Sequence, residues 1–140
     1  MNFTKFVLLL ISLVVINSVH AQNRRAFKEL NVGAAYSPDN MMDAHVFPGV
    51  SFLWGETYQN NKRILEWEAG IALPSIATGK LTLAYGELNK YSGISLRVWP
   101  LMIGPQFKMG QLTLSAELGT DTGISFYAQG IFTIGFRFDK

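Results

Sequence analysis

The last ten residues of the chain, IFTIGFRFDK (131–140), are the stretch that decides the class of fold. Large apolar side chains occupy every second position of it: Phe132, Ile134, Phe136 and Phe138. The positions between them carry small or polar side chains: Thr133, Gly135 and Arg137. Because successive side chains of a β-strand point to opposite faces, this pattern predicts a strand with one strongly apolar face.

The same period-two alternation recurs along the chain and is interrupted by turn residues such as Gly, Pro and Asn. It predicts about eight strands, over residues 30–36, 46–55, 65–73, 81–86, 94–98, 102–109, 112–118 and 124–138. The predicted turns include SPDN (37–40), YQNN (58–61), ATGK (77–80), ELNKYSG (87–93) and GTDTG (119–123). Short strands joined by tight turns are typical of antiparallel hairpins, so we expect an all-β domain. The exact strand count near Pro100 stays open.

The N-terminal segment MNFTKFVLLLISLVVINSVHA (1–21) has the parts of a secretory signal peptide. Lys5 supplies a positive charge, residues 6–16 are apolar except for Ser12, and Val19 and Ala21 are small residues at the −3 and −1 positions of a cleavage site. This run of 11 residues is shorter than the roughly 20 that a transmembrane helix needs. We therefore expect a cleaved signal peptide over residues 1–21 and a single β-barrel domain over residues 22–140.

Charge and composition argue against several classes of function. Loss of residues 1–21 would remove one of the 12 basic residues and none of the 10 acidic ones, which leaves a net charge of +1. Such a balanced chain does not resemble a nucleic-acid-binding protein. The chain has no Cys, and His45 is the only His after residue 21, so we expect no metal site, no cofactor and no enzymatic activity.

The second face of the predicted strands is rich in Gly, Ser and Thr and carries a few charges of both signs. Only 16% of the chain is charged, compared with about 25% in an ordinary soluble domain. A closed antiparallel up-and-down β-barrel accounts for both faces, because its narrow interior is small and polar while its exterior is apolar wherever it contacts lipid. Buried charges need partners, and we expect five residues to form an interior charge network: Glu66, Glu68, Glu117, Arg97 and Arg137.

A signal peptide, about eight amphipathic strands and a final strand of alternating aromatics resemble a small outer-membrane β-barrel of a Gram-negative bacterium. The resemblance implies that the last strand closes the barrel against the first, and that its apolar residues form the signal read by the outer-membrane assembly machinery: Phe132, Ile134, Phe136 and Phe138. Three features depart from the class. Asp139-Lys140 follow the last aromatic, the connections are short, and Pro48 and Pro105 each need a strand end or a bulge.

Trp54, Trp67 and Trp99 lie near predicted strand ends or on the apolar face, and we interpret them as an interfacial aromatic belt against outer-membrane lipid. The expected function is a structural or interaction role, with a lumen filled by side chains, because eight strands leave no aqueous channel. The alternative is a soluble periplasmic or secreted β-barrel or sandwich that binds an apolar small molecule. The sequence identifies no ligand.

Overall fold

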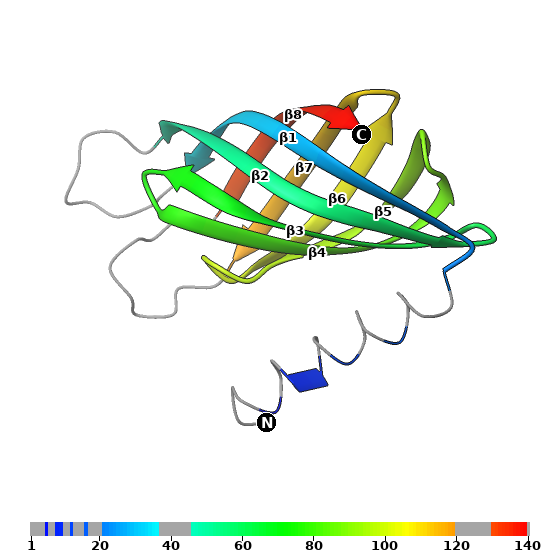
Figure 1. The fold of residues 1–140 in the computed structure, drawn as a ribbon. Helices are drawn as coiled ribbons and strands as arrows, with labels where there is room; N and C mark the ends of the chain where they lie inside the picture. Colours follow the sequence, from blue (N-terminus) through cyan, green and yellow to red (C-terminus); the bar gives the residue numbers. More distant parts are fainter. Residues whose placement is uncertain are drawn as a thin grey trace.

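The structure of the chain is a computed structural model that describes residues 21–36, 46–119 and 130–139, together with residues 5, 8, 9, 12 and 16. Eight strands form one closed barrel (Figure 1): β1 (Asn23–Tyr36), β2 (Val46–Asn60), β3 (Arg63–Leu73), β4 (Ile76–Glu87), β5 (Lys90–Arg97), β6 (Met102–Met109), β7 (Leu112–Gly119) and β8 (Gly130–Asp139). Every strand pairs antiparallel with its neighbours in sequence. The predicted all-β, up-and-down barrel is therefore confirmed.

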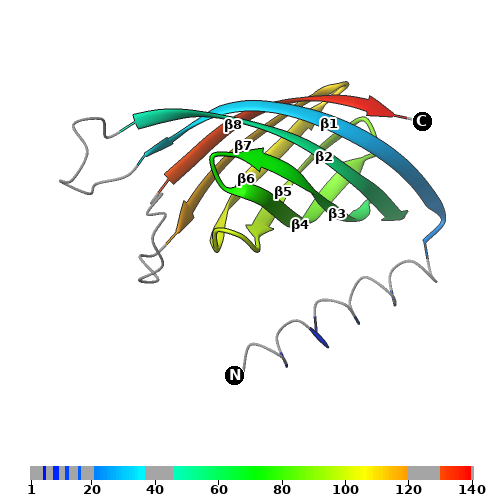
Figure 2. The same ribbon diagram turned by 60° about the vertical axis from the view of Figure 1, so that its left-hand side comes forward.

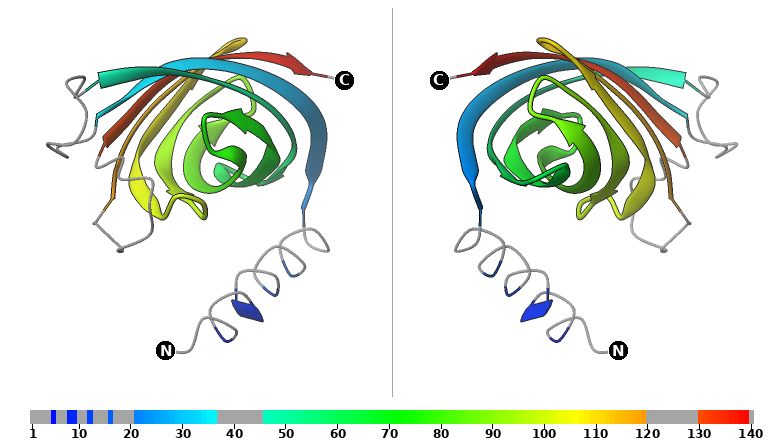
Figure 3. Two further views of the ribbon diagram at one scale, coloured as in Figure 1. Left: turned by 90° about the vertical axis from the view of Figure 1, so that its left-hand side faces the viewer. Right: turned by 90° about the vertical axis from the view of Figure 1, so that its right-hand side faces the viewer.

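The barrel is closed by the pairing of β8 with β1, which joins the two ends of the sheet. The register runs from Phe27 opposite Asp139 to Tyr36 opposite Gly130. The oblique view shows β1 beside β8 (Figure 2), and the view along the barrel shows the strands as a ring (Figure 3). Closure gives every strand two neighbouring strands, which removes the edge strand that an open sheet exposes.

The two ends of the barrel differ in their connections. At one end, which we call the tight-turn end, two-residue turns join β2 to β3, β4 to β5 and β6 to β7. Both Asn23 and Asp139 also lie at this end, since Asn23 pairs with Gln59 and Asp139 with Phe27. The opposite end, which we call the loop end, carries the connections over residues 37–45, 74–75, 98–101 and 120–129.

Several of the predicted strand boundaries are wrong. β2 continues to Asn60 through most of the predicted YQNN turn (58–61), and β5 begins at Lys90, inside the predicted ELNKYSG turn (87–93). The first strand begins at Asn23, well before the predicted residue 30, and the ATGK stretch (77–80) is part of β4, while the turn lies at residues 74–75. In these last two places the reason is the same. Polar residues that interrupt an apolar pattern, such as Glu29 and Lys80, are buried inside the barrel, so a charged side chain here marks an inward-facing position and not a turn.

Pro48 and Pro105, the two prolines within strands, each lie at a position that is paired with only one of the two neighbouring strands. Pro48 is in the first three residues of β2, before the pairing of β2 with β3 begins at Val50. Pro105 is in β6 at the point where the β6–β7 register skips from Ile103 to Gln106. A proline has no N–H to donate, so each is tolerated at a site that lacks one of its two ladders.

Several sequence predictions lie outside the described residues. They are the signal peptide, most of which is outside the described part of the chain, the SPDN turn (37–40), His45, the GTDTG turn beyond Gly119, and the start of the last strand before residue 130. Among the residues that the structure describes, no helix has the length and apolar character needed to cross a membrane.

Candidate functional site

The five charged residues that the sequence placed in the interior all point into the barrel, from the four strands β3, β5, β7 and β8. Their exposed fractions are small: Glu66 0%, Glu68 2%, Glu117 1%, Arg97 5% and Arg137 0%. The structure brings them together with two further charged residues, Glu29 of β1 and Lys80 of β4, which are also buried. We call these seven residues the interior network.

Arg137 is the residue of this network with the most partners. Its Nε and Nη2 donate to Glu29 Oε2 at 2.8 and 2.6 Å, and its Nη1 donates to Glu66 Oε2 at 2.6 Å. A further bond from Nη2 reaches Glu66 Oε1 at 2.9 Å, and the guanidinium lies 3.7 Å from the centre of the Phe27 ring. This arrangement ties β8 to β1 and β3 across the lumen, with two carboxylates for one guanidinium.

The Glu66 carboxylate is held by neutral donors as well. Thr57 Oγ1 and Tyr91 OH each donate to Glu66 Oε2 at 2.7 Å, and Gln106 Nε2 donates to Oε1 at 3.2 Å. These donors come from β2, β5 and β6. A buried carboxylate is costly unless its lone pairs are used, and Glu66 therefore links most of the barrel wall into one hydrogen-bonded unit.

A second cluster lies beside Glu117 of β7. Arg97 Nε donates to Glu117 Oε2 at 2.5 Å, and Ser95 Oγ donates to Glu117 Oε1 at 2.8 Å. Lys80 Nζ connects this cluster to the first, because it lies 2.8 Å from Glu68 Oε1 and 3.9 Å from Glu117 Oε1. Paired charges therefore fill much of the lumen, and on β5 and β7 they reach the loop end, where Arg97 is the last residue of its strand.

Sequence reasoning missed Glu29, Lys80 and the Gln106 amide. Each is obscured in the sequence for an identifiable reason: Glu29 precedes the predicted start of the first strand, Lys80 is in the predicted ATGK turn, and Gln106 lies beside Pro105, where the sequence predicts a strand end or a bulge. Period-two alternation would have found all three, since each is an even number of residues from an inward-facing residue on its own strand: Glu29 from Asn31, Lys80 from Thr82, and Gln106 from Lys108.

The exterior of the barrel has the opposite character. Large apolar side chains of every strand are exposed: Leu30, Val32, Val50, Trp54, Ile71, Leu73, Leu83, Tyr85, Ile94, Ile103, Phe107, Leu112, Leu118, Phe132, Ile134, Phe136 and Phe138 among them. The outward-facing charges that the structure describes lie towards the tight-turn end: Arg24, Lys28, Glu56, Arg63, Glu87 and Lys90. The remaining outer wall is an uncharged apolar surface, which we call the apolar band.

The residues predicted to signal assembly all face outward. Phe132, Ile134, Phe136 and Phe138 are between 41% and 50% exposed, and the Phe136 and Phe138 rings contact each other edge to face at 5.1 Å.

The predicted aromatic belt is only partly gathered at the barrel ends. Trp99 is 46% exposed and lies in the β5–β6 connection at the loop end, whereas Trp54 is 44% exposed in the middle of β2. Trp67 is partly buried and packs against a small cluster of Tyr58, Leu65 and Leu81. These three residues therefore differ in depth and environment, and they do not form one ring.

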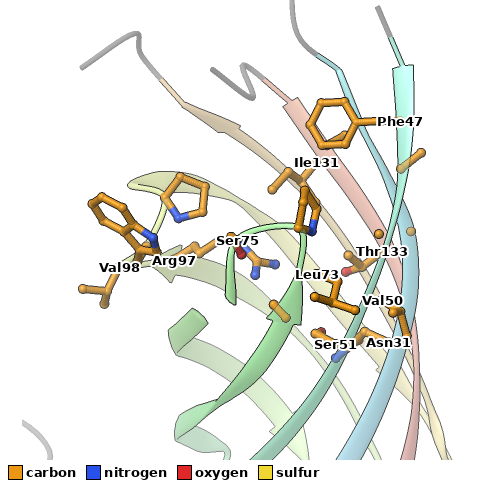
Figure 4. Close-up of a pocket in the computed structure, with 18 of the residues that line it drawn as sticks. Asn31, Phe47, Val50, Ser51, Leu73, Ser75, Arg97, Val98, Ile131 and Thr133 are labelled. Carbon is orange, nitrogen blue, oxygen red and sulfur yellow. The ribbon is translucent and has the colours of Figure 1, made fainter. Parts of the chain in front are cut away.

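A pocket of about 340 Å³ lies inside the barrel at the loop end. Figure 4 shows the labelled side chains around it, with Phe47 and Ile131 towards the rim and Asn31 and Ser51 at the bottom of the view. The prediction of a filled lumen therefore describes the network half of the barrel only. The volume is at the lower end of the range of about 300–1,000 Å³ that ligand sites span.

No group of three or more metal-ligating side chains is present among the described residues. Comparison with protein-family models, with curated proteins and with solved structures finds no match to this chain. The arguments for its function therefore come from the distribution of polar and apolar side chains over the barrel.

Proposed function

We propose that the chain is a small integral outer-membrane β-barrel with a structural or interaction role and no open pore. The observation that carries this proposal is the inverted polarity of the barrel: charged residues are buried in the lumen while the apolar band faces outward. Monomeric soluble proteins rarely expose contiguous apolar patches larger than a few hundred Å². Lipid is the solvent in which such an exterior and such an interior are both favourable.

The dimensions of the strands support the same proposal. A transmembrane β-strand needs about 9–11 residues when it is tilted by roughly 45°. The strands of this barrel run from 8 residues in β5, β6 and β7 to 15 in β2. The shorter strands would reach across the bilayer with the help of the residues that flank them.

The difference between the barrel ends suggests an orientation. Outer-membrane barrels have short periplasmic turns and longer extracellular loops. The tight-turn end carries three of the four two-residue turns and both termini of the barrel, so we assign it to the periplasmic side. The apolar side chains of β8 then form the proposed signal for the outer-membrane assembly machinery, which would also pair β8 with β1.

Cell fractionation of the full-length chain tests the location. We expect recovery in the outer-membrane fraction, resistance to an alkaline carbonate wash, and a shift in electrophoretic mobility between unheated and boiled samples. Release into the periplasm or the medium would contradict the proposal. It would instead favour the soluble barrel that binds an apolar small molecule.

A pair of substitutions on one strand tests whether lipid contacts the apolar band. Leu83 and Glu87 both face outward on β4, but Leu83 is in the apolar band and Glu87 is the last residue of the strand at the tight-turn end. Lysine on the lipid face costs about 2–4 kcal/mol at the bilayer midplane and about 0–1 kcal/mol near the interface. We expect Leu83→Lys to lower the yield of folded barrel in vesicles strongly, with Glu87→Lys close to the wild type. Equal yields for both variants would argue against a bilayer around this wall.

A further inference from the structure

The pocket at the loop end is created by the sizes of the inward-facing residues. Three successive rows cross β2, β1 and β8 at this height: Ser51–Asn31–Gly135, Gly49–Gly33–Thr133 and Phe47–Ala35–Ile131. We call them the floor, middle and rim rows. The middle row holds two glycines and a threonine, and the next strand, β3, contributes Ala72, so the side chains leave the centre of the lumen empty.

The floor of the pocket presents a polar group that lacks a partner. Asn31 is only 3% exposed. Its side-chain amide makes no hydrogen bond to any part of the chain that the structure describes, although the residue lines the pocket. Buried amides are normally hydrogen-bonded, because leaving one unsatisfied is costly. The Asn31 amide is therefore suited to bind a group that enters the pocket.

A second donor reaches the pocket from β5. Arg97 uses Nε for Glu117 and Nη1 for Thr78, and its side chain also lines the pocket. Figure 4 shows its guanidinium near Ser75 and Leu73. The charge of Arg97 is already balanced by Glu117 at 2.5 Å. The pocket thus offers hydrogen-bonding groups without an uncompensated positive charge.

The walls above this floor are apolar. Ala35, Phe47 and Ile131 line the rim from β1, β2 and β8, and Trp99 and Leu101 line the other side from the β5–β6 connection. Apolar walls around a few convergent polar groups are the usual composition of a small-molecule site.

We propose that this pocket binds an uncharged amphiphile, an aliphatic chain that ends in one hydrogen-bonding group such as an alcohol or a primary amide. The end group would contact Asn31, which supplies both a donor and an acceptor, with Ser51 and Arg97 beside it. The aliphatic chain would contact the rim. A carboxylate is disfavoured because it would enter next to Glu117, whose charge already neutralises Arg97. The pocket lies in the lumen, so the proposal does not depend on what surrounds the barrel.

Equilibrium dialysis of radiolabelled 1-decanol tests the proposal, with the barrel in phosphatidylcholine nanodiscs and empty nanodiscs as the reference. We expect saturable binding above the reference, and at least about tenfold weaker binding of decanoate. Ala72→Phe should abolish the binding because it fills the pocket. Ala69→Phe is the matched control, since Ala69 is exposed on the outer face of the same strand.

Asn31→Leu keeps the size of the side chain and removes the amide. We expect it to weaken decanol binding about tenfold and to leave decane binding unchanged. The mobility shift on heating verifies that each variant is folded. The absence of saturable decanol binding, or retained binding in a folded Ala72→Phe variant, would overturn the site. Tighter binding of decanoate than of decanol would overturn the uncharged ligand. If fractionation shows a soluble protein, the same equilibrium dialysis of decanol in buffer, without nanodiscs, tests the pocket separately.

Discussion

Two neighbouring layers of inward-facing side chains differ: one is filled by a charged pair, and the next borders a pocket. The row Leu53–Glu29–Arg137 on β2, β1 and β8 is filled, and its charged pair is fully buried with hydrogen bonds of 2.6 and 2.8 Å. Two residues further along each strand, the floor row Ser51–Asn31–Gly135 begins a pocket. The same three strands build both layers, so the difference comes only from the side chains that the strands point inward.

The two parts of the lumen therefore differ in what their side chains do: one part holds the strands together and the other encloses space. The interior network joins most of the strands by ion pairs and hydrogen bonds. We call the part of the lumen that these side chains fill the plug. Around the pocket, small inward-facing residues leave space and make few such contacts. The hydrogen bonds and ion pairs that tie the strands together therefore come from the plug, and few come from the pocket.

The largest expected effect is that of Arg137→Leu, which removes the central cation of the plug. Glu29 and Glu66 would keep their buried charges and lose the guanidinium that both of them contact. Removal of one partner from a buried ion pair costs about 3–5 kcal/mol. We expect a loss of that size in the free energy of unfolding, measured by urea titration in lipid vesicles.

Arg24→Leu is the matched control for that substitution. Arg24 also pairs with a glutamate, Glu56, at 2.5 Å, but its side chain is 62% exposed. An exposed pair contributes about 0–1 kcal/mol. If the two arginine variants were equally stable, the interior network would not be holding the barrel together.

The next largest effect is expected for one of two glutamates, Glu66 and Glu68, that face the lumen from β3. Glu66 accepts hydrogen bonds from Thr57, Tyr91, Gln106 and Arg137, whereas the one donor within 3 Å of Glu68 among the described residues is Lys80 Nζ, 2.8 Å from Oε1. We expect Glu66→Gln to cost about 2–3 kcal/mol in the same urea titration, because hydrogen bonds to a charged group are strong.

Glu68→Gln should cost less than about 1 kcal/mol. Lys80 would lose its contact with Glu68 but keep the Gln106 amide oxygen at 2.9 Å, and Glu117 lies 3.9 Å from its Nζ. A larger loss for Glu68→Gln than for Glu66→Gln would show that charge pairing, and not the number of hydrogen bonds, determines the stability of the plug.

The sequence was sufficient to predict the plug in outline and insufficient to predict the pocket. Alternation identifies which residues share a face, and buried charges need partners, so Glu66, Glu117, Arg97 and Arg137 could be placed together without coordinates. A pocket depends on which small residues of different strands become neighbours. That is fixed by register, and a shift of one residue would turn Gly33 and Gly49 to the outside.

The smallest effect is expected for alanine substitutions of two glycines on the inner face of β2. Gly55 lies in the plug and Gly49 lies in the pocket. A Cβ added at Gly55, in the plug, would lie 2.2 Å from the Trp67 carbonyl oxygen, 2.7 Å from Phe27 Cζ and 2.9 Å from Glu68 Cβ. At Gly49, in the pocket, the nearest atom would be the Leu73 carbonyl oxygen at 3.1 Å. Overpacking costs about 1–3 kcal/mol, so we expect Gly55→Ala to lower the free energy of unfolding by that amount.

Gly49→Ala should leave the stability nearly unchanged. The slight crowding at the carbonyl is offset by the smaller entropy of the unfolded chain, which is worth about 0.4–1 kcal/mol for a Gly→Ala change. Urea titration of the two variants side by side measures the difference directly. Equal losses would mean that the pocket is as tightly packed as the plug in solution, and the separation of the lumen into a rigid half and an open half would then fail.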